Sequence, residues 1–273
     1  MQQNSLPYHQ PYFEQVLLFS IAVLILTGLG FFIVTLVKRK KRIKESRQKE
    51  IFQQQIDAAL FSFLFDDKKI AEITEGVSFS KNFESGFFKR LCVKSIISLH
   101  YSYSGAYGKR LEDFYAQSGL AEYSLKKLNS EKWTGIVEGI RDLSNMNYVK
   151  AYPRIVSYKN HVHELVRTEV LLGMIKLKGI TELAKFNKSK LYLNDWVQSN
   201  ILYTVKRHHI PAPENMADLL NTKNQSLLLM AVRLINHYNK PEHYSLLSEY
   251  FSKTKNEQIR VELKRALRKT EQI

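Results

Sequence analysis

One stretch of the chain, residues 16–37, constrains its architecture more than any other. It reads VLLFSIAVLILTGLGFFIVTLV, contains neither a charge nor a proline, and has only Ser20, Thr27 and Thr35 as polar side chains. As a helix, these 22 residues would be roughly 33 Å long, enough to cross a bilayer hydrocarbon core of about 30 Å. We therefore predict a single transmembrane helix over residues 16–37.

The basic residues next to this run lie on one side of it. Residues 1–15 contain no Lys or Arg, whereas residues 38–49 contain eight, against one Glu. Because Lys and Arg are retained in the cytoplasm, we expect residues 1–15 to form a short tail outside the inner (plasma) membrane of a bacterium. Everything after residue 37 is then cytoplasmic. A cleaved signal peptide is disfavoured, since it would have basic residues before a shorter apolar run.

Residues 38–57 form a basic connector that has no Gly or Pro to interrupt a helix. Attraction to anionic lipid head groups stabilises such a segment by about 1 kcal/mol for each basic residue near the membrane surface. The predicted membrane-surface residues are Lys38, Arg39, Lys40, Lys41, Arg42 and Lys44. Nucleic-acid binding is the alternative role for the same charges.

The positive charge of the chain is concentrated in two segments. The formal net charge is +15, of which residues 38–49 contribute +7 and residues 253–269 contribute +5. The rest of the chain is close to neutral, so a uniformly basic surface for nucleic acid is not expected. The single cysteine, Cys92, excludes an intramolecular disulfide and fits a reducing compartment.

Beyond residue 57, apolar residues recur at helical spacing in blocks separated by polar residues, Gly, Asn or Pro. Longer helices are predicted to begin near residues 86, 131, 164, 193, 225 and 256, with shorter ones near 108–118, 148–157, 180–187, 214–221 and 242–252. Asn160, Asn194 and Asn224 suit the N-caps of three longer helices. A period of about 30 to 45 residues with two helices per unit is typical of an α-solenoid.

Two segments with similar layouts extend this prediction. Residues 166–172 read VRTEVLL and residues 259–263 read IRVEL. Both resemble the second helix of a HEAT repeat, which commonly opens with an aliphatic–Arg pair, although the Asp that usually precedes the Arg is missing here. The resemblance implies an all-α chain: one N-terminal transmembrane helix, then a HEAT/armadillo-like right-handed α-solenoid of about five or six helix pairs over residues 58–273. An irregular helical bundle is the alternative.

The sequence has no motif for catalysis or for a cofactor. His163-Glu164 opens like the zinc motif HExxH, but Arg167 stands where the second His ligand would be. The two ligands that zinc needs on one helix face are therefore not present. A P-loop and a nucleophile elbow are also missing. We expect a protein that is not an enzyme and that has neither a metal site nor a cofactor.

Tyrosines are concentrated in one part of the chain, with eight of the 15 between residues 101 and 158. Tyrosine is favoured at binding hot spots because it combines a large apolar ring with a polar hydroxyl. The candidate partner-binding residues are Tyr101, Tyr103, Tyr107, Tyr148, Tyr152 and Arg167. The alternative is that these rings pack between helices, with their hydroxyls at the rim.

Together these features favour a membrane-tethered, non-enzymatic scaffold or adaptor that binds a protein partner at the cytoplasmic face of the membrane. An envelope-building assembly, including a membrane enzyme, is one candidate partner. Tethering would raise the effective concentration of the solenoid for membrane-bound partners. The alternative function is a basic HEAT-like protein that binds nucleic acid at the membrane, although the near-neutral centre of the chain argues against it.

Overall fold

The computed structural model describes residues 11–66, 68–187, 191–239 and 244–270. These residues contain helices and no strand, which confirms an all-α fold. The chain divides into two compact units, Met1–Ala58 and Ala59–Ile273. Residues 1–10 of the predicted tail, and residues 242–243 of the predicted last short helix, lie outside the described residues.

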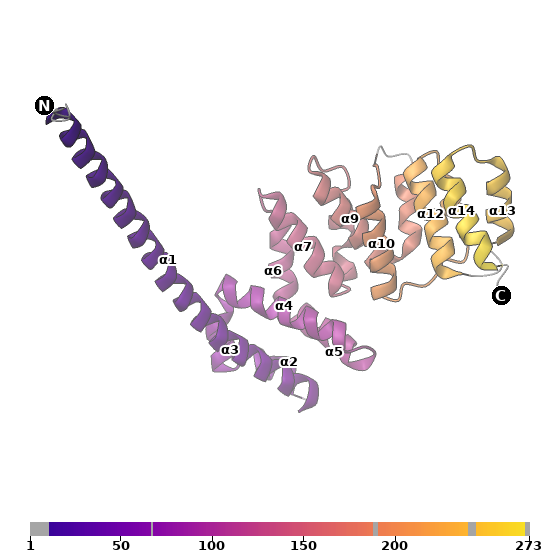
Figure 1. The fold of residues 1–273 in the computed structure, drawn as a ribbon. Coiled ribbons are helices and arrows are strands. Elements are labelled where there is room, and N and C mark those ends of the chain that lie inside the picture. The colour runs from indigo at the N-terminus through magenta and orange to yellow at the C-terminus, as the bar shows by residue number, and fades with distance from the viewer. Residues whose placement is uncertain (1–10, 67, 188–190, 240–243, 271–273) are drawn as a thin grey trace, which may run out of the picture. The chain divides into compact units, whose positions relative to one another are not determined.

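The first helix, α1, runs from Pro11 to Phe65 and contains the predicted transmembrane segment (Figure 1). Every side chain of residues 16–37 is exposed in the structure. Among the described residues, this is the one helix that is long and apolar enough to cross a membrane. The side chains of residues 16–37 pack into no core in the structure, and an apolar surface of this kind is stable when lipid surrounds it.

The three hydroxyls of the apolar run have partners inside the helix itself. Ser20 Oγ donates to the carbonyl of the residue four positions earlier (2.8 Å), and Thr35 Oγ1 does the same (2.8 Å). Thr27 Oγ1 donates to the carbonyl three positions earlier, at 2.9 Å. Because lipid offers no hydrogen-bond partner, this back-bonding lets the three polar side chains lie in an apolar environment at little cost.

The basic connector continues α1 without a break, as its lack of Gly and Pro predicts. All six predicted membrane-surface side chains are exposed. Lys41 Nζ lies 4.0 Å from a carboxylate oxygen of Glu45 one turn later. An exposed pair of this kind contributes little stability, so the connector keeps its cations available to solvent or to anionic head groups.

In the Ala59–Ile273 unit, six longer helices begin within two residues of the predicted positions. These helices are α4 (Gly86–Ser102), α7 (Trp133–Asn145), α9 (Glu164–Lys178), α10 (Asp195–Arg207), α12 (Gln225–Tyr238) and α14 (Glu257–Thr270).

Shorter elements lie between or before the longer helices. They are α2 (Ile70–Thr74), α3 (Val77–Phe83), α5 (Ala106–Gln117), α6 (Leu120–Lys127), η1 (Val149–Ala151), α8 (Tyr152–Val156), η2 (Ile180–Phe186), α11 (Ala217–Leu220) and α13 (Tyr244–Lys253). The sequence did not predict α2, α3 or α6. Helix α6 shows why a short helix escapes detection. It follows α5 after only two residues, because Gly119 adopts a φ of +84° and turns the chain sharply.

Helices of this unit pack mainly on their neighbours in the chain. Contacts join α6 to α7, α7 to α9, α9 to α10, α10 to α12 and α12 to α14, while α8 and η2 pack on α9, α11 on α12, and α13 on α14. Figure 1 shows α7, α9, α10, α12 and α14 side by side in chain order. The apolar side chains between successive helices form a core that extends along the whole row.

The helix caps agree with two of three predictions. Asn194 Oδ1 accepts from the backbone N–H of Val197 (2.9 Å), and Asn224 Oδ1 caps α12 in the same way. The prediction for Asn160 is wrong: the N-cap of α9 is His163, whose Nδ1 accepts from the first turn of that helix. Asn160 belongs to the turn that follows α8, and three further residues separate it from α9.

Two glycines allow close packing around α7. A Cβ atom added at Gly139 would lie 2.9 Å from the carbonyl oxygen of Ser124 in α6. One added at Gly173 in α9 would lie 3.0 Å from a methyl carbon of Ile140.

The Cys92 thiol lies fully inside the Ala59–Ile273 unit, and burial raises its pKa to about 12. This thiol is a packing group and not a nucleophile.

Candidate functional site

Helix α10 displays large aromatic side chains to solvent. Trp196 is 57% exposed, and Tyr203, two turns further along the same face, is 64% exposed. Tyr192, in the segment that leads into the helix, is 73% exposed. We call these three residues the α10 aromatic stripe. Exposed apolar surface of this kind marks interaction sites, and Trp and Tyr are enriched among the residues that contribute most to binding.

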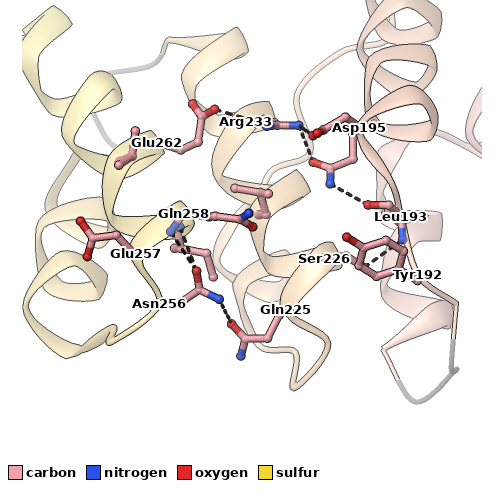
Figure 2. Close-up of a pocket in the computed structure, with 14 residues that line it drawn as sticks. Tyr192, Leu193, Asp195, Gln225, Ser226, Arg233, Asn256, Glu257, Gln258 and Glu262 are labelled. Carbon is pink, nitrogen blue, oxygen red and sulfur yellow. Dashed lines mark hydrogen bonds and ion pairs between the residues drawn. The ribbon is translucent and has the colours of Figure 1, made fainter.

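A groove lies beside this stripe, between the first turns of α10, α12 and α14 (Figure 2). Its volume is about 350 Å³. Apolar side chains of Leu229, Ile259 and Val261 form part of its lining. We call it the α10–α14 groove. It is open at the surface, so it can receive a segment of another molecule without rearrangement of the helices.

Arg233 of α12 links the three helices that form the groove. Its Nη1 donates to Asp195 Oδ1 (3.0 Å) and Gln198 Oε1 (2.9 Å) on α10. Its Nε lies 3.4 Å from Glu262 Oε1 on α14. The Arg233 side chain is only 23% exposed, and a partly desolvated guanidinium that bridges several acceptors is held firmly in place. Figure 2 shows this bridge at the top of the groove.

The groove is acidic although the chain as a whole is basic. Its lining includes the carboxylates of Asp195, Glu257 and Glu262 and the single cation Arg233. Three negative charges and one positive charge leave a formal charge of −2. Glu262 also pairs with Arg265, which is exposed outside the lining. The groove therefore suits a ligand that brings positive charge.

Amide side chains complete the groove wall. Asn256 Nδ2 donates to Gln225 Oε1 (3.2 Å), while Asn256 Oδ1 caps α14 by accepting from the backbone N–H of Gln258 (3.0 Å). Gln198 Nε2 donates to the carbonyl of Leu193 (2.8 Å). Because an amide has both donors and an acceptor, Gln225 and Gln258 offer groups that can pair with the backbone of an extended peptide.

Three of the predicted partner-binding residues lie together at the turn between α4 and α5. The rings of Tyr103 and Tyr107 are 5.9 Å apart, and Phe65 packs against both. Tyr101 is 37% exposed and Tyr107 is 41% exposed. The Tyr101 ring faces the end of α10, where the guanidinium carbon of Arg207 lies 4.8 Å from its centre.

The other three predicted residues lie elsewhere and make internal contacts. The Tyr148 ring packs on Tyr115, and the Tyr152 hydroxyl donates to Glu182. Arg167 Nη1 donates to two carbonyls of residues 161–162, at 2.8 Å each, which fixes the segment that leads into α9. The structure thus groups Tyr101, Tyr103 and Tyr107 and separates them from Tyr148, Tyr152 and Arg167.

The α10 aromatic stripe was missed in the sequence. Its signal was available, because Trp196 and Tyr203 are seven residues apart and so lie on one helix face. The same spacing is typical of buried stripes, for example Val170, Met174 and Leu177 of α9, which are all buried. Only the packing of α10 shows which of its faces stays in solvent.

Metal chemistry and known relatives give no further guide. Within the part of the chain that the structure describes, no group of three or more His, Cys, Asp or Glu side chains could hold a metal ion. No family model, no curated protein and no solved structure matches the chain. The function must therefore be inferred from the chemistry of the surfaces described above.

Proposed function

We propose that this protein is a single-pass membrane scaffold that binds a protein partner at the cytoplasmic face of the membrane and does not catalyse a reaction. The observation that carries this proposal is the α10 aromatic stripe beside the acidic, amide-lined α10–α14 groove. Trp and Tyr side chains that stay exposed next to a braced groove are suited to hold an extended peptide segment of a partner.

We further propose that residues 58–273 form a HEAT-like right-handed α-solenoid. Three facts support this arrangement: long and short helices alternate, successive long helices pack on each other, and Asn caps recur at 194, 224 and 256. A solenoid of this kind offers a long surface on which each unit contacts only its neighbours. The first helix pair of the proposed solenoid, α4 and α5, departs most from a regular repeat.

The proposed location is the inner membrane of a bacterium, with residues 1–15 outside and the solenoid in the cytoplasm. The asymmetry of eight basic residues after the apolar run and none before it supports this orientation. The exposed cations of residues 38–44 would contact anionic head groups. A membrane-bound partner is then met at a raised effective concentration, which suits an envelope-building membrane enzyme.

The groove indicates what the partner segment looks like. Its formal charge of −2 favours a peptide with Lys or Arg, and its apolar and aromatic surroundings favour a neighbouring large apolar side chain. DNA or RNA, the alternative ligand, would be repelled by the carboxylates of Asp195, Glu257 and Glu262.

Site-specific photo-cross-linking of the full chain in bacterial cells tests the proposal. The photoreactive residue p-benzoylphenylalanine replaces Trp196 in one variant and Val162 in a matched control, because Val162 is also exposed (90%) but lies outside the stripe. We expect one protein cross-linked through position 196 and none through position 162. With that partner purified, Trp196→Ala/Tyr203→Ala should weaken binding to the full chain in nanodiscs by about a hundredfold.

Two outcomes would overturn the proposed function. One is an equal set of cross-links from positions 196 and 162, which would show that the stripe has no preferred partner. The other is tight DNA binding by the full chain in nanodiscs of neutral lipid, with an affinity that falls steeply with salt. That result would favour the nucleic-acid alternative.

A further inference from the structure

A second cavity lies where the turn between α4 and α5 approaches the end of α10. Its volume is about 540 Å³. Tyr101 of α4 and His208 after α10 contact each other here: their rings are edge to face, with centres 5.8 Å apart. The two residues are more than a hundred positions apart in the sequence. We call this the α4–α10 cavity, and it is separate from the α10–α14 groove at the other end of α10.

The α4–α10 cavity is rich in groups that can carry positive charge. Its lining includes His100, Lys109, Arg207, His208 and His209, against the single carboxylate of Glu112. That carboxylate is already engaged: one of its oxygens lies 3.2 Å from a ring nitrogen of His100, and the other 3.2 Å from Lys109 Nζ. Glu112 therefore pairs with groups on the α4–α5 side of the cavity, and within the described residues no ion pair joins it to Arg207.

Arg207 is the cation that the cavity leaves available. Its guanidinium stacks on the Tyr101 ring, and no ion pair joins it to a carboxylate of any described residue. Stacking on an aromatic ring fixes the plane of a guanidinium while its N–H groups stay free to donate. An oriented guanidinium of this kind matches two oxygens of a phosphoryl group in a single plane.

His208 lies partly buried beside the cationic Arg207. Burial lowers the pKa of His208 to about 4, and the nearby charges of Lys176 and Arg207 act in the same direction. His208 is therefore neutral near pH 7, when it can still donate one ring N–H. The positive charge of Arg207, which also lines the cavity, would attract an anion.

Neutral donors complete the wall. The hydroxyls of Tyr101, Tyr103 and Ser104 and the amide of Asn147 line the cavity with the cations. Gly105, with φ of +66°, turns the chain into α5, and no side chain caps that helix. Donors thus come from α4, the following turn and α10, so an anion in the cavity can be contacted from more than one side.

We propose that the α4–α10 cavity binds the phosphoryl group of a soluble phosphorylated small molecule, with Arg207 as its principal ligand. The cavity is in the size range of small-molecule sites. Its ligand would bridge the α4–α5 pair and α10, so the occupied cavity would hold these helices together. The inference does not depend on the protein partner proposed above, because the α10 aromatic stripe and the groove share no lining residue with this cavity.

Calorimetric titration of the full chain with inorganic pyrophosphate tests this site, using nanodiscs of phosphatidylcholine so that no anionic lipid is present. Arg207→Met removes the proposed ligand. Lys206→Met is the matched control, because it removes the same charge from the exposed neighbouring residue outside the lining. We expect saturable binding at one site, a loss of at least about tenfold for Arg207→Met, and less than about twofold for Lys206→Met.

Several results would overturn the proposal. One is the absence of saturable pyrophosphate binding by the unaltered chain. Another is an equal loss of affinity for Arg207→Met and Lys206→Met, which would mean that pyrophosphate is attracted by the general positive charge. If Arg207→Met lowers the melting temperature, Arg207→Lys is titrated in its place, because this variant keeps the positive charge but removes the planar guanidinium. An unchanged affinity in this variant would also contradict the role of Arg207. Finally, nanodiscs that contain phosphatidic acid distinguish the source of the phosphoryl group: if they block pyrophosphate binding through Arg207, the ligand is a lipid head group and not a soluble molecule.

Discussion

Helix α10 contributes to two hollows of opposite charge. At its first turn, Asp195 lines the acidic α10–α14 groove, and at its last turn Arg207 lines the cationic α4–α10 cavity. The same division is favoured within any helix, because the N-terminal end of the helix dipole attracts carboxylates and the C-terminal end attracts cations. One helix with Asp195 at its start and Lys206 and Arg207 at its end therefore gives two neighbouring sites opposite preferences.

The two hollows also differ in how their charges are held. In the groove, Arg233 bridges α10, α12 and α14, so each helix is braced through charged side chains. In the cavity, Arg207 stacks on a ring, and Glu112 pairs only with groups on α4 and α5. The cation of the groove is thus already paired with carboxylates, whereas the cavity has a cation that a ligand would neutralise.

The largest expected effect is a loss of partner binding that leaves the α4–α10 cavity unaffected. Trp196→Ala/Tyr203→Ala should weaken partner binding by about a hundredfold, because two exposed aromatic anchors are lost. Trp196→Ala alone should leave pyrophosphate affinity unchanged in calorimetric titration, since Trp196 lies at the start of α10 and does not line the α4–α10 cavity. A parallel loss of both affinities would show that the two hollows form one site.

The second effect concerns the brace of the groove. Arg233→Met removes hydrogen bonds to Asp195 and Gln198 and leaves the Gln198 side chain, which is 2% exposed, short of a partner. We expect the free energy of unfolding to fall by about 1–3 kcal/mol, measured by urea denaturation of the full chain in detergent. Arg265→Met is the matched control, because its pair with Glu262 is exposed and contributes little. Equal losses would contradict the bracing role.

The third effect is a pH dependence that belongs to the cavity. The pKa of His208 is about 4 in the folded chain and about 6.5 when the chain is unfolded, so the unfolded state takes up this proton at higher pH. Stability should therefore fall as the pH drops from about 6.5 towards 4. The groups that face His208 are His100, Lys176, Arg207 and His209.

His208→Gln should lose less stability than the unaltered chain between pH 7 and pH 5 in urea denaturation. His209→Asn is the control, since residue 209 has a φ of +48° that Asn tolerates. This control should keep most of the pH dependence of the unaltered chain, because His209 is the smallest of the causes that lower the pKa of His208. If His208→Gln retains the full pH dependence, another group is responsible.

The smallest expected effect tests the charge of the groove. Asp195→Asn removes one carboxylate whose side chain is 86% exposed, so screening limits its contribution. We expect a two- to threefold loss of affinity for the partner at low salt, about the size that an exposed pair allows, and a smaller loss at high salt. A gain in affinity would mean that the partner segment is not cationic.

The sequence predicted the helices well because their signals are local. Helix starts near 86, 164 and 225 were predicted from apolar residues at helical spacing, which needs no knowledge of the rest of the fold. Asn224 also marked the last of the three as its cap. Asn160 failed as a cap because it lies in the turn after α8, with three residues between it and α9, and no local rule gives the length of the loop between them. Helix α6 was missed since two residues sufficed for the turn before it.

The two hollows could not be predicted in the same way. Tyr101 was singled out for its place in a tyrosine-rich segment, but its partners Arg207 and His208 come from a helix far along the chain. The α10–α14 groove likewise needs the lateral packing of three helices, and the exposed face of α10 depends on what its neighbours leave uncovered. The sequence shows the charges at the two ends of α10, but it does not show which hollow each charge lines.

The Asn caps carry a consequence for how such a chain can change its length. Asn224 starts α12 and also donates to the carbonyl of Leu191 (2.7 Å), and Asn256 starts α14 and also donates to Gln225 (3.2 Å). Each cap therefore brings both the start of a helix and its joint to the preceding segment. A variant that repeats residues 224–255 would therefore repeat one helix start and one such joint, and we expect it to lengthen the row by one helix pair.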